Sequence, residues 1–457
     1  MADKTSFDLI VIGAGPGGYV AAIRAAQLGQ SVAVVEKDKA GGRCLNYACI
    51  PAKTMLHTAE VFDHAQNSAD IGVKVTGAEL DWDALGTRRT DVSASLEHGV
   101  EGLFKNHKIQ LIRGEASITA DANVTVGDDT YEAAKIIVAT GSAAQSIPGV
   151  EFSDRVVDTW GAWSLPAQPK SVAIVGAGAS GAELASAYIR FGTEVRLIEM
   201  LPQILPAEDK DVVRVVERTF KKQGIEVSTG TPVENVEVSD KSVKFTYGDN
   251  SAEVDYLMIA GGRVADVGVL GLDAAGVKVG DNGKIEVDEY QRTSNEKIYA
   301  IGDIVPGSAL AHKAMEEGIV AAEHIAGAET HPVNLELVPG ATFCHPQVAS
   351  VGLTEAQAKE AGHDVKTGKF KLGGVGAGTV YNDRDGMVKL VVDKKYGEIL
   401  GAHIVGNRAC DMIAELVAVM ALEGGIQELQ RIMHPHPTIS EAVMECARAV
   451  DGWATHA

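Results

Sequence analysis

Residues 8–18 read DLIVIGAGPGG, an apolar run that passes directly into a cluster of glycines. The apolar run suits a strand that is buried on both faces of a parallel sheet. Gly13, Gly15 and Gly18 permit a tight turn, and they let a pyrophosphate lie on the N-terminus of the alanine-rich helical stretch that follows. The pattern predicts a strand, a turn and a helix that together bind a dinucleotide.

The residues that follow complete such a unit. Gly29 ends the helical stretch, a second strand covers Ser31 to Val35, and Glu36 comes directly after it. Glu36 is placed to accept hydrogen bonds from ribose hydroxyls. A single pattern of this kind is weak evidence, because glycine turns are common.

The same unit occurs a second time. Its parts are the strand Ser171 to Val175, then Gly176, Gly178, Gly181, Gly192 and Glu199. In both copies the helix-ending glycine follows the first glycine by 16 positions, and the glutamate follows it by 23. Two copies in one register predict two dinucleotides, and one must be a flavin if electrons are to reach a third site, because nicotinamides carry only hydride.

Two cysteines follow the first unit, in residues 41–53, GGRCLNYACIPAK. In an ideal helix, residues five apart have Cα atoms ~8 to 9 Å apart, beyond the ~7 Å limit for a disulfide. Pro51 removes the amide that would bond back to Tyr47, so this turn can be distorted. Cys44 and Cys49 are therefore either a redox pair in a strained first turn or two unrelated thiols, and spacing alone leaves both open.

This segment resembles the Gly-Gly-x-Cys-x-Asn-x-x-Cys-x-Pro-x-Lys signature of the pyridine-nucleotide disulfide oxidoreductases. The resemblance implies that Cys44 exchanges with the substrate and that Cys49 contacts the flavin. It also implies that Lys53 pairs with a glutamate near the flavin ring, and Glu183 stands at that glutamate's place.

The resemblance runs along the whole chain, through residues 139–142, 299–303 and 311–314. It assigns residues to both cofactors, and no metal site is expected. Those for FAD are Gly13, Gly15, Gly18, Glu36, Lys37, Gly42, Lys53, Ala116, Thr140, Gly141, Ser142, Asp303 and Ala311. Those for NAD are Gly176, Gly178, Gly181, Glu183, Glu199, Val233 and Gly262.

The expected fold is α/β, with two Rossmann-like dinucleotide-binding domains and a C-terminal α+β dimerisation domain. Residues 1–147 form the FAD domain with the cysteines, 148–264 the NAD domain, 265–338 a region completing the FAD domain, and 339–457 the interface domain. In the last of these, Met387 to Val392 and Ile399 to Val405 read as strands, and about Asp411 to Leu422 as a helix.

A histidine-rich segment follows, His434-Pro435-His436-Pro437, with Glu441 shortly after it. On the residues alone, this pair of histidines fits a turn, a metal site, or a base oriented by a carboxylate. The family resemblance implies the last: His436 is the catalytic base and Glu441 its partner, both acting in the other subunit's site.

Within the family, the branch that oxidises dihydrolipoamide fits best. The C-terminal tail holds only Cys446, without the second cysteine pair of mercuric reductases or the redox tail of large thioredoxin reductases. Glutathione-type reductases favour NADPH, whereas Glu199 has no arginine directly after it to neutralise a 2′-phosphate. A homodimer that takes its substrate from the lipoyl domain of an unidentified carrier protein is expected. A reductase of another disulfide, a diaphorase and a flavoprotein docking subunit remain alternatives.

Some positions depart from the family's usual pattern. Ala179-Ser180 stands where many members have a bulky residue and isoleucine, Ala265-Asp266 replaces Pro-Asn, and Tyr47-Ala48 replaces a smaller residue and glycine. These changes leave the chemical groups of the signature intact.

The composition limits the partners. The net charge is 41 − 62 = −21, so nucleic acid and anionic membrane surfaces are not expected to bind. An acidic surface serves solubility, or the docking of a basic partner domain. No signal peptide is expected, because Met1 to Phe7 is short and polar. No membrane span is expected either, because the chain has no apolar run of the ~18 residues that a span needs. With five cysteines, too few for a secreted disulfide framework, the expected compartment is the cytoplasm.

Overall fold

The structure, a computed structural model, describes residues 5–456. The prediction that the N-terminal residues are not a leader therefore lies partly outside the described residues. Among those described, no helix is both long and apolar enough to cross a membrane. The described chain divides into two compact units. The first contains residues up to Thr54, Asp83–Gln145 and Gly262–Val333, and the second contains Met55–Trp82, Ser146–Gly261 and residues from Asn334 onward.

The first unit is built on a sheet in the order β3-β2-β1-β6-β5-β4, with β17 also paired to β6. Its parallel strands are β1 (Ser6–Ile12), β2 (Val32–Glu36), β3 (Gln110–Arg113), β6 (Asp129–Val138) and β17 (Ile298–Ala300). The antiparallel strands β4 (Ala116–Ile118) and β5 (Val124–Val126) extend β6. A separate ribbon pairs β7 (Ser142–Ala144) with β16 (Arg263–Ala265). The helices that begin in this unit are α1 (Pro16–Gln27), α2 (Gly42–Tyr47), α3 (Cys49–Asn67) and α8 (Ala311–Ala326). A further helix, α4, covers Trp82–Asn106.

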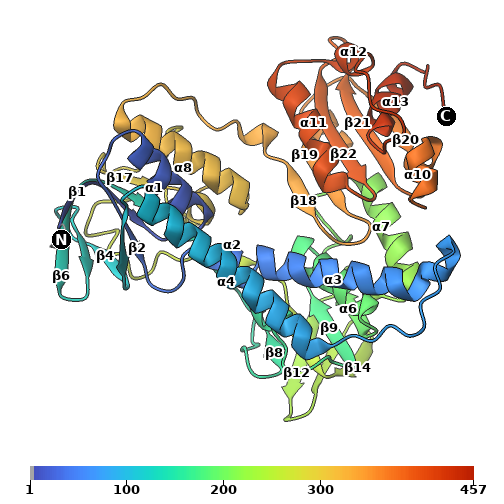
Figure 1. The fold of residues 1–457 in the computed structure, drawn as a ribbon, viewed down its shortest axis with the longest axis horizontal. Helices are drawn as coiled ribbons and strands as arrows, with labels where there is room; N and C mark the ends of the chain where they lie inside the picture. Colours follow the sequence, from blue (N-terminus) through green and yellow to red (C-terminus); the bar gives the residue numbers. More distant parts are fainter. Residues whose placement is uncertain (1–4, 457) are drawn as a thin grey trace. The chain divides into compact units, whose positions relative to one another are not determined.

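Helices α1 and α8 lie side by side although almost 300 residues separate them in the chain (Figure 1). Glycines make this approach possible. A Cβ atom added at Gly17 would lie 2.8 Å from the carbonyl oxygen of Ala314, and one added at Gly318 would lie 2.6 Å from that of Gly17. Since real Cβ atoms do not come so close to backbone, both positions need glycine.

In the second unit, residues 146–261 form the second dinucleotide-type fold. The parallel sheet has the order β11-β10-β9-β15-β8. Its strands are β8 (Val156–Val157), β9 (Ser171–Val175), β10 (Glu194–Ile198), β11 (Glu226–Ser228) and β15 (Tyr256–Ile259). An antiparallel sheet joins β12 (Val233–Val238), β13 (Val243–Tyr247) and β14 (Asn250–Val254). The helices are α5 (Thr159–Trp163), α6 (Ala179–Arg190) and α7 (Lys210–Gln223).

The C-terminal part of the second unit is an antiparallel sheet in the order β18-β19-β22-β21-β20. The strands are β18 (Gly340–Thr342), β19 (Val348–Gly352), β20 (Val365–Lys371), β21 (Met387–Asp393) and β22 (Ile399–Val405). The helices are α9 (Glu355–Glu360), α10 (Gly376–Val380), α11 (Ala409–Ala421), α12 (Ile426–Leu429) and α13 (Glu441–Val450). The two strands and the helix expected here are present with nearly the expected bounds. The α/β fold class is confirmed.

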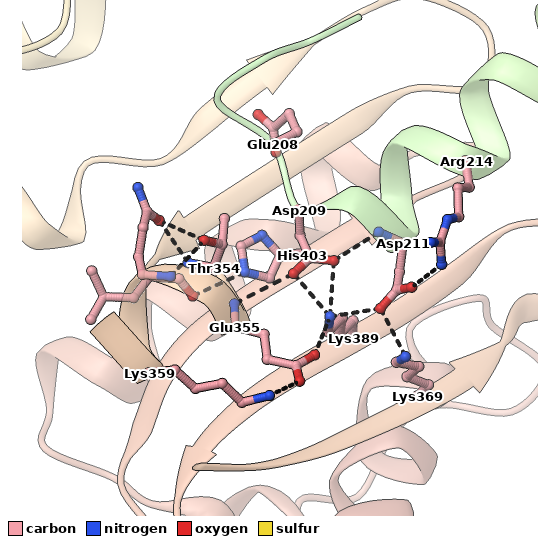
Figure 2. Close-up of polar contacts among 12 residues, drawn as sticks. Glu208, Asp209, Asp211, Arg214, Thr354, Glu355, Lys359, Lys369, Lys389 and His403 are labelled. Carbon is pink, nitrogen blue, oxygen red and sulfur yellow. Dashed lines mark hydrogen bonds and ion pairs between the residues drawn. The ribbon is translucent and has the colours of Figure 1, made fainter. Parts of the chain in front are cut away.

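A buried charge network joins α7 and α9 to this sheet (Figure 2). Lys389 lies on β21 with none of its side chain exposed. It donates to Asp209, the N-cap of α7, over 2.9 Å, to Asp211 over 2.7 Å and to Glu355 of α9 over 2.8 Å. This network ties residues 209–211 to the C-terminal sheet, which agrees with their falling in one compact unit. The expected division of the chain into four regions stays a prediction.

Candidate active site

The two glycine loops have nearly the same backbone. Gly13 and Gly176 have φ angles of 102° and 96°, a region that side chains rarely adopt. A Cβ atom at Gly18 would lie 1.9 Å from the carbonyl oxygen of Gly13, and one at Gly181 would lie 1.9 Å from that of Gly176. These four glycines are therefore required by the fold of each loop.

A different reason explains why the middle residue of each loop is glycine. A Cβ atom added at Gly15 or Gly178 would meet no protein atom within 4 Å. Both residues are N-caps, of α1 and of α6, so each stands where backbone N–H groups of a helix N-terminus are free to bind an anion. A side chain there would fill space that the protein itself leaves open, and this fits a pyrophosphate at each loop.

Each predicted ribose-binding glutamate also braces its own glycine loop. Glu36 accepts hydrogen bonds from the amides of Ala14 and Asp38, over 2.7 and 2.8 Å. Glu199 accepts them from Ala177 and Leu201, over 2.7 and 2.9 Å. Both carboxylates are buried. Since each carboxylate oxygen can accept two hydrogen bonds, capacity for ribose hydroxyls remains.

Five of the residues assigned to FAD line one pocket in the first unit. They are Gly13, Glu36, Lys37, Ala116 and Thr140. Asp266, one of the departures from the family pattern, also lines this pocket. Its carboxylate lies 3.3 Å from the ammonium of Lys37, and its carbonyl oxygen accepts from the hydroxyl of Thr140 over 2.7 Å.

Two more residues assigned to FAD are in contact with each other. The Ser142 hydroxyl donates to the Asp303 carboxylate. Arg263, which sequence analysis gave no role, donates to the Ser142 hydroxyl over 2.7 Å and lies 3.6 Å from the Asp303 carboxylate. Its position directly after Gly262 was the only feature of the sequence that could have pointed to these contacts.

A buried ion pair holds the backbone next to Asp303. Lys313 and Glu317 lie 2.6 Å apart, with 0% and 2% of their side chains exposed. Glu317 accepts from the amide of Gly302 over 2.8 Å, and Lys313 donates to the carbonyl oxygen of Gly302 over 3.3 Å. Burial raises the pKa of Glu317, while Lys313 and the Gly302 amide lower it. Lys313 lies in the family motif at residues 311–314, but no sequence pattern predicted its pair with Glu317.

The remaining assigned residues are spread over both units. Ala311 begins α8, Gly141 precedes β7, and Val233 begins β12. Glu183, buried on α6, accepts from the amide of Phe343 over 2.9 Å. Lys53 and Gly262 belong to the first unit, whereas Glu183 and Val233 belong to the second. The pairing of Lys53 with Glu183 stays a prediction.

The two cysteines lie on either side of a break between two helices. Helix α2 ends at Tyr47, Ala48 has the non-helical angles φ −134° and ψ −90°, and α3 begins at Cys49. Pro51 falls in the first turn of α3, where its missing amide is not needed. The expectation of one helix with a strained first turn differs from the structure, because the chain instead starts a second helix.

This break lies beside the first glycine loop. The Gly41 amide donates to the carbonyl oxygen of Ala14 over 2.8 Å. A Cβ atom added at Gly42 would lie 2.6 Å from the Cα of Gly15. The start of α2, and with it the cysteine segment, is therefore held against the loop that fits a pyrophosphate.

The thiols of Cys44 and Cys49 interact. The hydrogen bond to Cys49 is the largest cause of a raised Cys44 pKa, followed by burial and the electrostatic influence of Cys49, while Lys53 lowers it. Such a pair can carry two electrons as a dithiol or a disulfide.

His436 and Glu441 are in contact, as predicted for a base and its partner. The Nδ1 atom of His436 lies 2.9 Å from Oε1 of Glu441, and the amide of Thr438 donates to Oε2 over 2.9 Å. Burial opposes ionisation of Glu441, but the Thr438 amide and His436 lower its pKa below the usual value. The His436 side chain is 75% exposed, so it is accessible for proton transfer.

Comparison with known families covers almost the whole chain. Residues 7–318 match the family described as pyridine nucleotide-disulphide oxidoreductase. Residues 338–447 match the dimerisation domain of the same family.

Individual relatives match along their full length. A protein of Geobacillus stearothermophilus named dihydrolipoyl dehydrogenase is 42% identical, with 98% of this chain and 97% of the relative covered. One of Rhizobium etli with the same name is 41% identical, with 96% and 97% covered.

Solved structures share the fold. The flavoprotein disulfide reductase RclA of Escherichia coli, described as HOCl-induced, has a TM-score of 0.87 at 26% identity, with 96% of this chain and 99% of that chain covered. LpdA of Mycobacterium tuberculosis has a TM-score of 0.88 at 25% identity, with the same coverage. The chain belongs to the pyridine nucleotide-disulphide oxidoreductase family.

Proposed function

We propose that the chain oxidises dihydrolipoamide to lipoamide and reduces NAD⁺ to NADH, through a disulfide between Cys44 and Cys49. The observation that carries the proposal is the interacting thiol pair at the break between α2 and α3, held against a dinucleotide loop. Relatives named dihydrolipoyl dehydrogenase, about as long as this chain, support this choice of substrate.

The cofactors are FAD and NAD(H). The first glycine loop, Glu36 and the pocket beside them hold the adenosine end of FAD in this proposal, and Ser142 and Asp303 hold its more distal part. The second loop and Glu199 hold NAD(H). Bound FAD supplies a two-electron relay between the dithiol and the nicotinamide.

The protein's own groups perform the thiol chemistry in two exchanges. A substrate thiol, deprotonated by the base, attacks the sulfur of Cys44, and the disulfide breaks with Cys49 leaving as a thiolate. The second substrate thiol attacks the substrate sulfur bound to Cys44, its proton passes to the departing Cys44 sulfur, and cyclic lipoamide is released. The substrate has lost two electrons and two protons. The hydrogen bond between the two thiols fits the reduced state that these exchanges produce.

The base in this proposal is His436 of the partner subunit, oriented by its Glu441. The match to the dimerisation domain supports a homodimer. The exposure of His436 within one chain agrees with a residue that serves a site on another. Neutral imidazole near pH 7 can take up a thiol proton, and the carboxylate stabilises the imidazolium that forms.

The physiological substrate in this proposal is the lipoyl group of a carrier protein, and the enzyme works in the cytoplasm. The finding that no described helix can cross a membrane agrees with this location. The acidic net charge of −21 suits a carrier whose docking domain is basic.

The test is an assay of the purified holoenzyme with dihydrolipoamide and NAD⁺, run beside glutathione disulfide with NADPH and with NADH. The proposal predicts rapid formation of NADH in the first reaction and slow turnover in the others. Efficient reduction of glutathione disulfide without oxidation of dihydrolipoamide would instead make the chain a reductase of another disulfide.

A further inference from the structure

A second histidine–glutamate pair lies beside the pair assigned to catalysis. His434 Nε2 lies 2.7 Å from Oε1 of Glu415, and its Nδ1 lies 3.2 Å from the carbonyl oxygen of Ile432. Neither His434 nor Glu415 has a part in the proposed chemistry. The two histidines of the His-x-His motif thus have separate carboxylate partners.

The two pairs hold the ends of one short segment on two different helices. Glu415 lies on α11, and Glu441 is the first residue of α13. That segment, residues 432–438, is neither helix nor strand, and the Thr438 hydroxyl donates to the carbonyl oxygen of Pro435 over 2.8 Å. Its backbone position therefore depends on these side-chain contacts.

The two histidines differ in how far their side chains are buried, and this difference distinguishes their roles. Only 4% of the His434 side chain is exposed, against 75% of that of His436. An exposed side chain receives little orientation from packing, so the position of His436 depends on Glu441 and on the backbone that carries it. His434 is the buried residue that fixes that backbone on the α11 side.

We infer that His434, bound to Glu415, is a positioning residue for the catalytic base His436, because it fixes the segment 432–438 to α11. This inference rests on the proposed function, because it assigns the residue a part in the same reaction. General-base catalysis requires hydrogen-bond reach to the proton that is removed, so a small displacement of the base is costly.

The charges around His434 agree with this role. The hydrogen bond to Glu415 raises the pKa of His434, which burial opposes, and the charges of Glu415 and Glu441 raise it further. His434 in turn helps to lower the pKa of Glu441. The charged groups that act on it are Glu415 from α11 and Glu441 from α13. A cation at His434 therefore weakens the hold of Glu441 on a proton at His436.

The experiment compares variants of the full-length holoenzyme. His434→Ala removes the anchor, His434→Gln keeps an N–H donor for Glu415 without the charge, and Glu415→Gln removes the opposite charge. His331→Ala, at an exposed position, is the matched control. Two activities are measured for each: dihydrolipoamide oxidation, which needs the base, and NADH-dependent reduction of a dye, which needs only the cofactors. Gel filtration verifies that the variants keep the oligomeric state of the wild type.

The expected result is a selective loss. His434→Ala should lower kcat for dihydrolipoamide about 10- to 100-fold, as expected for a displaced base, with dye reduction unchanged. His434→Gln should recover most of kcat. Its profile of kcat/KM against pH should nevertheless have the ascending limb shifted to higher pH, because Glu441 then holds the proton of His436 more firmly. Glu415→Gln should not shift that limb upward.

The outcomes separate this inference from the proposed function. If the wild type oxidises dihydrolipoamide and His434→Ala loses no more activity than His331→Ala, the positioning role is wrong and the proposed function stands. Equal losses of dye reduction and dihydrolipoamide oxidation would also overturn it, because the effect would then be on the whole fold. A wild type inactive toward dihydrolipoamide would overturn both.

Discussion

Cys44 and Cys49 need an interrupted helix in order to interact, and Ala48 provides it. Its non-helical backbone lets α2 end and α3 begin between the two thiols. Neither cysteine contributes to the glycine loop or to the pocket beside Glu36. Thiol chemistry and flavin binding therefore depend on different residues, and they should respond differently to substitution.

Replacing Cys44 or Cys49 by serine should abolish dihydrolipoamide oxidation and leave FAD bound. The ratio of flavin to protein after gel filtration measures binding, and NADH-dependent dye reduction verifies that the bound flavin still reacts. If both serine variants kept activity near that of the wild type, electrons would not pass through this pair.

The preference for NAD over NADP follows from Glu199. The buried carboxylate is held by the amides of Ala177 and Leu201 and cannot move away from a 2′-phosphate. The nearest arginine in the sequence, Arg196, is paired with Glu194 and Glu226. Repulsion and lost hydrogen bonds should make kcat/KM for NAD⁺ about 30- to 1000-fold higher than for NADP⁺. Equal efficiency with both nucleotides would contradict this reading of Glu199.

Among the helices and strands, those that begin and end at strong local signals were predictable. Strands β1 and β9 contain apolar runs, and each is followed by a tight turn whose positive φ angle favours glycine. The break between α2 and α3 was not predictable, because Pro51 permits either a distorted turn or a new helix. Lys389 was also missed, since a lysine in a strand normally faces water, and its partners Asp209 and Asp211 lie about 180 residues earlier.

The residues of the candidate site also divide into those that could be predicted from the sequence and those that could not. Residues in glycine loops and in the family motifs could be assigned from the sequence, and many of them line one pocket or contact one another. The residues that hold them in place, Glu317, Arg263 and Glu415, could not be assigned from the sequence, because no local sequence pattern marks them. Each acquires its role only from a contact that the folded chain creates.

The network around Lys389 should contribute strongly to the stability of the C-terminal part. Lys389→Met leaves Asp209, Asp211 and Glu355 without their shared cation, and breaking a buried ion pair costs about 3–5 kcal/mol. The thermal midpoint of the holoenzyme measures the loss. Lys394→Met, which removes an exposed lysine 3.6 Å from Asp364, is the control and should change little. Equal midpoints for the two variants would contradict the structural role of the network.

The same network should make the stability of the folded chain depend on pH in the acid range. Burial opposes ionisation of Asp211, but Lys369 and Lys389 lower its pKa to about 2; Lys359 and Lys389 lower that of Glu355 to about 2. Because these pKa values are lower in the folded than in the unfolded chain, their stabilising effect is full above pH ~4.5 and disappears as the pH falls toward ~2. Thermal midpoints measured across this range should fall, and less steeply in Lys389→Met.

In the dimer, each active site should contain the cysteines of one subunit and His436 of the other. A His436→Ala chain mixed with a Cys44→Ser chain should form hybrid dimers with one complete site and one site lacking both groups. With random exchange, roughly half the dimers are hybrids, so roughly a quarter of the wild-type activity should return. Mass spectrometry of differently labelled chains verifies the exchange. Hybrids that form but stay inactive would mean that His436 serves the cysteines of its own chain.

Dihydrolipoamide should pass its electrons to a disulfide between Cys44 and Cys49, and the number of free thiols in the protein shows whether it does. The chain has five cysteines, so a disulfide leaves 5 − 2 = 3 thiols. The oxidised holoenzyme is treated anaerobically with excess dihydrolipoamide without NAD⁺, freed of small molecules, unfolded and titrated. We expect three thiols before treatment and five after it, with peptide mapping assigning the two new ones to Cys44 and Cys49. Five thiols both before and after treatment would contradict it.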